Sequence, residues 1–248
     1  MLKLDDITDS ILQYHPNADI DIILNAYVFT AKAHRGQSRK SGEAYLSHPL
    51  EVAYNVTRLK MDEVSVAAAL LHDTIEDTMT TAQEILDAFG EEVYQLVDGL
   101  TKISQIEFAS KEEKQAENFR KMILAMSKDI RVILIKLADR AHNIKTLGSM
   151  QEASQKRIAR ETLEIFAPLA HRLGIGWVKA ELENEAFKYI DPKNFKLIDE
   201  KLELKQEQRE KLVDRVCEII SSELESAEVQ GRIMGRPKNI FSIFSKME

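Results

Sequence analysis

Residues 62–77 read DEVSVAAALLHDTIED, and this stretch decides the fold class of the chain. Asp62 is a favourable N-cap residue, so the sequence predicts that a helix begins here. From Val64 to Leu71 nearly every side chain is apolar, which indicates a helix that is buried on all sides. We therefore expect this helix to lie at the centre of its domain.

The segments on both sides of this stretch also read as helices. The 248 residues include only five Pro and nine Gly, which favours long helices over many short strands. Amphipathic stretches run over residues 151–172 and 177–189, and we predict an all-α fold. Further helix starts are predicted at Asp19, Pro49, Thr81 (a capping box with Glu84) and Asp129, and helix ends at Gly36 and Gly90.

Composition excludes several classes of protein. A net charge of −7 and a pI of about 5.5 make the chain a poor general binder of DNA or RNA backbones. Cys217 is the only cysteine, so no internal disulfide can form, which suits a reducing compartment. The N-terminus is acidic where a signal peptide would be basic, and no apolar run is long enough to span a membrane. We expect a cytoplasmic protein.

Chemistry concentrates in residues 72–77, which read HDTIED. Burying these charged groups together is costly unless something compensates them, and a divalent cation does so. His72 and Asp73 point about 100° apart on a regular helix, so they converge only at an enclosed pocket. Glu76 and Asp77 follow them by four residues and project toward the same pocket if the helix persists that far.

Two further residues complete a candidate ligand set. His48 lies in YLSHPL, just before an expected helix start, and Asp139 lies on the face of a helix that Val132 and Ile135 define as buried. Two nitrogens and two or more oxygens suit manganese, iron or another borderline divalent ion with room for water. A lone His-Asp pair is more often a cap or a surface pair, but the set of four needs coincidences in three separate helices.

These motifs resemble the hydrolase domain of the Rel/SpoT alarmone proteins, a branch of the HD-domain phosphohydrolases. HDTIED is preceded by AHRGQSRKSGEAYLSHP and followed by LTKI and KLADRAHNIKTL, over about residues 20–190. The resemblance implies a compact helical domain that removes the 3′-pyrophosphate of (p)ppGpp. It assigns manganese to His48, His72, Asp73 and Asp139, and the activation or orientation of the attacking water to Glu76 and Asp77.

The basic residues before His48 allow two interpretations of their role. By composition alone, Arg39-Lys40 is a solvated loop pair; beside a metal site in an acidic chain, it is a clamp for a polyphosphate. The remaining basic and polar residues near the ligands, Lys136, Arg140 and His142, either help or serve structural roles. The residues that the resemblance places on the guanosine and its phosphates are Arg35, Arg39, Lys40, Ser41, Tyr45, Asn143 and Thr146.

The chain changes character near Asp191-Pro192. Residues 196–225 are highly charged and predict a connecting helical segment with a solvated face. The stretch AEVQGRIMGR, residues 227–236, reads as a short strand, and FSIFSKME opens one more helix. We predict three parts: residues 1–195, 196–225 and 226–248.

The last part resembles the opening of the family's synthetase domain. GRPKNIFSIFSKM matches it, and the resemblance places Arg232, Arg236, Lys238 and Lys246 on ATP. We therefore expect the chain to be part of a longer bifunctional protein with a synthetase domain and a C-terminal regulatory region.

Two alternatives to (p)ppGpp hydrolysis stay open. One is a regulatory HD module without catalysis, against which the intact His72-Asp73 and Glu76-Asp77 argue. The other is an HD phosphohydrolase for a different nucleotide, against which Arg39-Lys40 with YLSHP argues. Neither DNA nor a membrane is expected as a partner.

Overall fold

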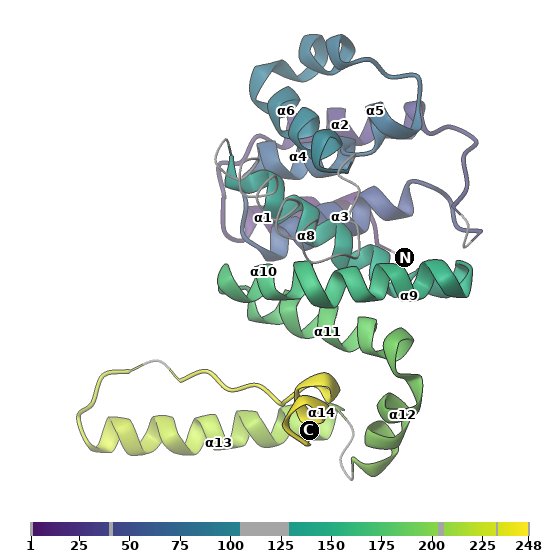
Figure 1. Ribbon diagram of the computed structural model, residues 1–248. Helices are drawn as coiled ribbons and strands as arrows, with labels where there is room; N and C mark the ends of the chain where they lie inside the picture. Colours follow the sequence, from purple (N-terminus) through teal and green to yellow (C-terminus); the bar gives the residue numbers. More distant parts are fainter. Residues whose placement is uncertain (1, 40–41, 105–128, 203–205, 232, 248) are drawn as a thin grey trace. The chain divides into compact units, whose positions relative to one another are not determined.

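The computed structural model describes residues 2–39, 42–104, 129–202, 206–231 and 233–247. Within these ranges the chain is mostly helical. The β-pairing among the described residues is a single isolated antiparallel bridge between Ser38 and Ala44. The all-α prediction is confirmed. The chain divides into two compact units, residues 1–182 and 183–248 (Figure 1).

The first unit carries the predicted chemistry. Its helices are α1 (Leu4–Leu12), α2 (Ile20–Ala33), α3 (Ser47–Arg58), α4 (Glu63–Leu71), α5 (Thr74–Asp77), α6 (Ala82–Ser104), α8 (Ile130–Lys145), the 3-10 turn η1 (Leu147–Ser149), α9 (Glu152–Glu161), the π-helical turn η2 (Thr162–Phe166), α10 (Ala167–Arg172) and α11 (Gly176–Ile190), which continues into the second unit.

Helix α4 is the centre of the first unit. The Asp62 side chain caps it by accepting a hydrogen bond from the backbone N–H of Ser65 at 2.8 Å. Every residue from Ser65 to Leu71 is buried, and the helix contacts α2, α3, α6 and α8. The prediction of a central helix buried on all sides is confirmed.

Helix α6 bends at Gly90, where the sequence predicts a helix end. Gly90 has φ 81°, a conformation that L side chains rarely adopt, and the helical segment that follows begins at once. The predicted capping box forms, because Glu84 accepts from the Thr81 N–H at 2.8 Å and Thr81 Oγ1 accepts from the Glu84 N–H at 3.2 Å. Downstream, Gly99 lets α6 approach α8, since a Cβ there would lie 3.0 Å from Val132.

One arginine joins the starts of two helices to α6. Arg131, in the first turn of α8, donates to Asp62 at 2.9 Å and to Asp129 at 2.7 Å, and it pairs with Glu92 of α6 at 2.8 Å. Asp62 and Asp129 are the N-caps of α4 and α8. A single guanidinium therefore fixes the spacing between these elements.

The second unit has its own small apolar core. Its helices are the end of α11, α12 (Pro192–Lys201), α13 (Gln206–Ser226) and α14 (Ile240–Met247). Phe187, Ile198 and Ile240 are buried, and five partly buried hydrophobic residues pack against them, namely Phe195, Leu202, Phe241, Ile243 and Phe244. The charged segment predicted over residues 196–225 thus falls on two helices.

The prediction of a short strand over residues 227–236 is wrong for those of its residues that the structure describes. Residues 227–231 and 233–239 form a turn and irregular chain. An extended segment needs a neighbouring strand to share its backbone hydrogen bonds, and here the segment lies against α13 instead: a Cβ on Gly235 would lie 2.8 Å from Cys217 Sγ. The domain division and the synthetase assignment of residues 226–248 stay predictions; Arg232 lies outside the described residues.

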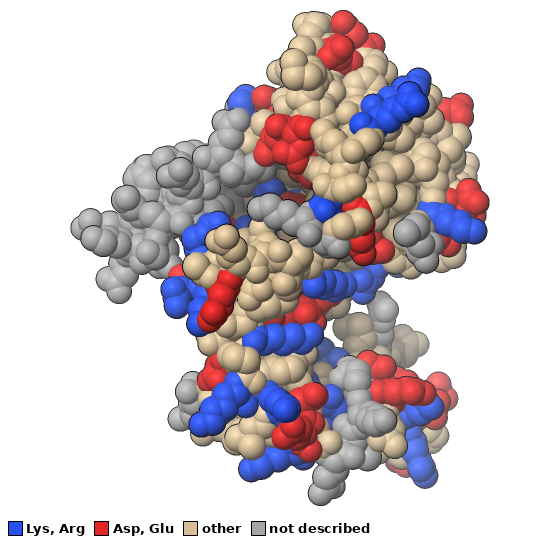
Figure 2. Space-filling model, turned by 90° about the vertical axis from the view of Figure 1, so that its right-hand side faces the viewer, with Lys and Arg blue, Asp and Glu red and all other residues tan. Residues whose placement is uncertain are grey.

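The surface is mixed in charge. On the face shown in Figure 2, acidic and basic side chains alternate in small groups instead of forming one large basic area. Among the described helices, none has the length and apolarity that crossing a membrane requires.

Candidate metal centre

The site begins where α4 stops. The helix does not persist through Asp77: α4 ends at Leu71, His72 and Asp73 form a turn, and α5 begins at Thr74. The carbonyls at the end of α4 are satisfied by side chains, with Thr30 donating to Leu70 at 2.9 Å and Thr74 donating to Leu71 at 2.6 Å. This break frees His72 and Asp73 from the 100° separation of a regular helix.

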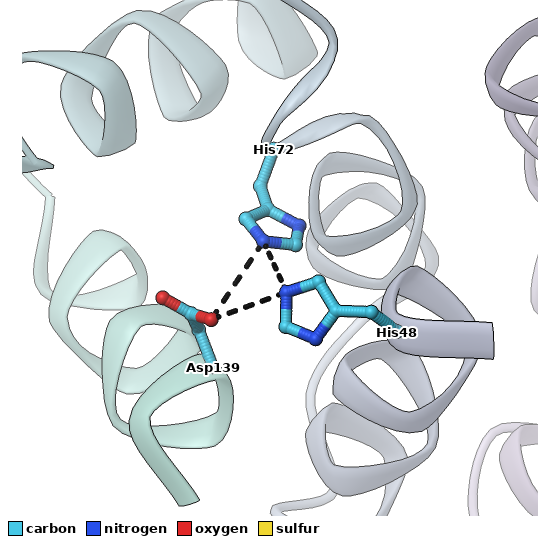
Figure 3. Close-up of side chains that lie close together, drawn as sticks. All are labelled: His48, His72 and Asp139. Atoms are coloured by element: carbon cyan, nitrogen blue, oxygen red, sulfur yellow. Dashed lines mark hydrogen bonds and ion pairs between the residues drawn. The ribbon is translucent and has the colours of Figure 1, made fainter. Parts of the chain in front are cut away.

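Three buried side chains, from α3, from α8 and from the turn after α4, meet at this break (Figure 3). His48 lies in the first turn of α3, and its Nε2 is 3.2 Å from His72 Nε2. Asp139 projects from the middle of α8, and its Oδ1 is 3.3 Å from His48 Nε2 and 3.8 Å from His72 Nε2. One ligand atom from each residue lies within 4.8 Å of the others.

Asp73 adjoins this group as a fourth donor. Its Oδ1 is 3.1 Å from His72 Nε2 and its Oδ2 is 3.4 Å from His48 Nε2. The Asp73 side chain is 20% exposed, whereas those of the other three are 6% exposed or less. The four predicted ligands are therefore brought together, with Asp73 on the open side.

The hydrogen bonds around His72 fit a metal site. Its Nδ1 lies 2.7 Å from the Ala69 carbonyl, and a carbonyl oxygen only accepts, so Nδ1 carries a proton. In the neutral ring the lone pair is then on Nε2, the atom that faces Asp139 and His48. A ligating histidine commonly donates its other N–H to a carbonyl in this way, and two imidazoles with two carboxylates suit a divalent ion.

Charge at the site is balanced by neighbours. Burial would raise the pKa of Asp139, but Lys136 Nζ, 2.9 Å from its Oδ2, and the two imidazoles hold that pKa well below its usual range. Burial would lower the pKa of His72, but Asp73 and Asp139 raise it to about 9. Asp139 is thus ionised, and a divalent ion would replace the second proton of the His72 imidazole at Nε2.

Tyr45 connects the ligand set to α5. Its hydroxyl donates to Asp73 Oδ2 at 3.0 Å and contacts Asp77 Oδ2. The Tyr45 ring stacks on His34, with centroids 4.0 Å apart, and Gln37 donates to the Asp77 carbonyl at 3.1 Å. The structure therefore places Asp77 next to Asp73, and both Asp77 and Glu76 are exposed on the same short helix.

The predicted nucleotide contacts divide into groups. Arg39 donates to Asn143 Oδ1 at 2.8 Å, and Asn143 Nδ2 donates to Asp139 Oδ1 at 2.5 Å, so both adjoin the ligands. Thr146 caps the end of α8 through its own backbone. Arg35 is exposed in the turn after α2, and no contact among the described residues joins its side chain to the four ligands. Lys40 and Ser41 lie outside the described residues.

Some of the contacts around the site are absent from the sequence interpretation. His142 Nδ1 lies 2.7 Å from His48 Nδ1, and Lys136 pairs with Asp139. Both follow a helical spacing of three from Asp139, which is the signal that points to them. Helical spacing from Asp139 does not point to Gln37 or His34, because both residues lie in the turn and loop that follow α2.

Comparison with known proteins gives the family. The model of the HD domain family matches residues 26–176. A protein of Myxococcus xanthus named GTP pyrophosphokinase is 53% identical over 242 residues, which are 96% of this chain and 32% of that protein. The Escherichia coli K12 protein named bifunctional (p)ppGpp synthase/hydrolase SpoT is 44% identical over 247 residues, 100% of this chain and 35% of that protein.

The chain thus spans about a third of the length of these curated relatives. A solved structure, described as a metazoan ortholog of SpoT that hydrolyses ppGpp, is 24% identical with a TM-score of 0.47, and the match covers 70% of this chain and 96% of that one. The resemblance to Rel/SpoT proteins that the motifs indicate is confirmed by the curated relatives. With a family model that matches from α2 to the start of α11, the chain belongs to the HD domain family.

Proposed function

We propose that this chain hydrolyses (p)ppGpp at its 3′-pyrophosphate in a metal-dependent reaction that yields GDP or GTP and pyrophosphate. The observation that carries the chemistry is the convergence of His48, His72 and Asp139 beside Asp73. The choice of substrate is supported by the relatives named for (p)ppGpp synthesis and hydrolysis, which match along the whole chain.

The proposed ligands are His48, His72, Asp73 and Asp139, and the proposed ion is manganese. Nitrogen and oxygen donors in this ratio favour a borderline divalent ion. A bound divalent ion would polarise a phosphoryl oxygen and lower the pKa of a water. Three of the proposed ligands are buried, and the close packing around them restricts the movement of their side chains.

Glu76 and Asp77 are proposed to orient the attacking water and accept its proton. The position of Asp77 supports this role, since the Tyr45 hydroxyl bridges it to Asp73. A carboxylate held next to the ligand set is in reach of a water there. Tyr45 thereby positions a carboxylate in addition to its proposed contact with the nucleotide.

The proposed nucleotide site lies along Arg39, Asn143 and the turn that follows α2. Arg39 already points at α8, where it donates to Asn143. A guanidinium offers several donors in a planar fork, so Arg39 can hold a phosphate while it keeps one of its present contacts. Arg35, Lys40, Ser41 and Thr146 remain proposed contacts.

A nucleotide panel tests the function. The purified chain is incubated with ppGpp, pppGpp, deoxynucleoside triphosphates and NADPH, with Mn²⁺ or with EDTA, and products are separated by anion exchange. We expect GDP or GTP plus pyrophosphate, formed only from the guanosine 3′-diphosphates and only with metal. Metal binding without any hydrolysis would favour a regulatory module, and turnover of another nucleotide alone would favour a different HD phosphohydrolase.

A further inference from the structure

The two histidine ligands are held from behind by different groups. His72 Nδ1 donates to the Ala69 carbonyl, so the backbone fixes its tautomer. His48 also directs Nε2 toward the ligand set, but its Nδ1 lies 2.7 Å from another imidazole nitrogen, Nδ1 of His142. Distance alone does not say which of these two nitrogens carries the proton.

The contact between Arg39 and His142 indicates which of the two nitrogens carries the proton. One of its guanidinium nitrogens lies 3.3 Å from the same His142 Nδ1. A guanidinium has donors and no acceptor, so His142 Nδ1 must accept. The proton between the two imidazoles then belongs to His48 Nδ1, and the lone pair of neutral His48 lies on Nε2, where Asp73 and Asp139 converge.

We propose that His142 is a positioning residue that presents His48 Nε2 to the metal. This inference rests on the proposed metal site. His142 follows Asp139 by three residues on α8, so this helix supplies one ligand and also orients a second ligand that α3 carries. Arg39, the proposed phosphate clamp, is the outer member of the same chain of contacts.

The consequence of losing His142 follows from burial. His48 is 1% exposed, so water does not readily replace the lost acceptor, and a buried N–H without a partner is unfavourable. The ring would turn or exchange its proton to Nε2, and either change withdraws the lone pair from the ligand set. Removing an outer partner of a metal-ligating histidine typically lowers metal affinity by about 10- to 100-fold.

Mn²⁺ titration of the metal-free protein, with free Mn²⁺ counted by electron paramagnetic resonance, tests the inference. His142→Leu removes the acceptor and should weaken Mn²⁺ binding by about 10- to 100-fold. His142→Asn keeps an acceptor oxygen close to the position of Nδ1, and should bind within a few-fold of the wild type. His171→Leu makes the same change at an exposed histidine of α10 and should bind like the wild type.

A tautomer measurement settles the point even if His142→Leu does not fold. The chain has six histidines, so ¹⁵N-histidine labelling and long-range ¹H–¹⁵N spectra of the protein saturated with diamagnetic Zn²⁺ resolve each ring. We expect the proton of His48 on Nδ1 and that of His142 on Nε2. A proton on Nδ1 of His142, or equal Mn²⁺ affinity in the leucine variant, overturns the inference, whereas the nucleotide panel decides the proposed function separately.

Discussion

His72 and Asp73 are neighbours in the sequence, yet both face the same point, because a turn replaces the helix between Leu71 and Thr74. The remaining proposed ligands, His48 and Asp139, come from α3 and α8. Each ligand therefore depends on a different local feature: a helix start for His48, a helix end for His72 and Asp73, and a buried helix face for Asp139. Residue-level predictions can separate these contributions.

Replacement of Asp73 with Asn should abolish metal binding and hydrolysis together. The amide lacks the charge that balances a divalent ion, and Asp73 is the ligand on the open side of the set. Metal content by mass spectrometry and (p)ppGpp turnover measure the two effects. Asp9→Asn, at an exposed position of α1, is the matched control. Full activity with normal metal content in Asp73→Asn would remove it from the ligand set.

Glu76→Gln and Asp77→Asn should retain the metal but lose roughly 10²- to 10⁴-fold in turnover, the range for a general acid or base. Both lie on α5, beyond the ligand turn. Metal content and single-turnover rates, measured on the same preparations, distinguish the roles. If either variant lost its metal, that residue would be a ligand and the proposed division of labour would be wrong.

Sequence reasoning predicts which four side chains lie together, but it does not predict the contacts that surround them. His48, His72, Asp73 and Asp139 are found because ligand types recur beside helix signals and a family motif. The contact between His142 and His48 joins residues 94 apart in sequence, and only the packing of α3 against α8 creates it. The break after Leu71 also escapes the pattern, since Thr30 and Thr74 stabilise it from outside the helix.

At the scale of elements, Arg140 of α8 contacts the end of α9 through an ion pair and the π-helical turn η2 through an aromatic ring. Arg140, next to Asp139, donates to Glu161 at 2.7 Å, and its guanidinium lies 4.2 Å from the Phe166 ring centroid. The two charged side chains are 14% and 9% exposed. Because π-helical turns are rare and often accompany functional sites, the contacts of Arg140 with Glu161 and Phe166 are candidates for what orients α8.

Removal of Glu161 alone should cost more than removal of the pair. Glu161→Leu leaves a buried guanidinium without its partner, and we expect a loss of about 3–5 kcal/mol in the free energy of unfolding. Arg140→Met with Glu161→Leu removes both charges and should recover most of that loss. Urea unfolding of the wild type, the single variant and the double variant gives the values; equal losses in both variants would contradict a charge-pair explanation.

At the scale of the whole first unit, Arg131 holds the N-caps of α4 and α8 and the middle of α6 together. The Arg131 guanidinium lowers the pKa of Asp129, and hydrogen bonds from Ser65 and Arg131 lower the pKa of Asp62 against the opposing effect of burial. Folding thus favours the ionised forms of both carboxyl groups.

Stability should therefore fall in acid. A carboxyl group with a lowered folded pKa contributes fully above its unfolded pKa, which is about 3.9 for Asp, and its contribution disappears as the pH drops through the folded value. Urea midpoints measured from pH 7 down to pH 2 should show this decline. Arg131→Met should lower the midpoint at pH 7 and flatten its dependence on pH; an unchanged slope would show that other carboxyl groups govern acid unfolding.

The burial of helix α4 predicts that different parts of the site exchange amide hydrogens with solvent at different rates. Its residues from Val66 to Leu71 are fully buried, so their amides exchange hydrogen with solvent only when the surrounding unit unfolds. Asp77 lies on the single-turn helix α5 and is exposed, which is typical of segments that open locally and often. Two of the proposed ligands, His72 and Asp73, thus directly follow a slowly exchanging helix, whereas the proposed proton acceptors lie on a segment that opens locally.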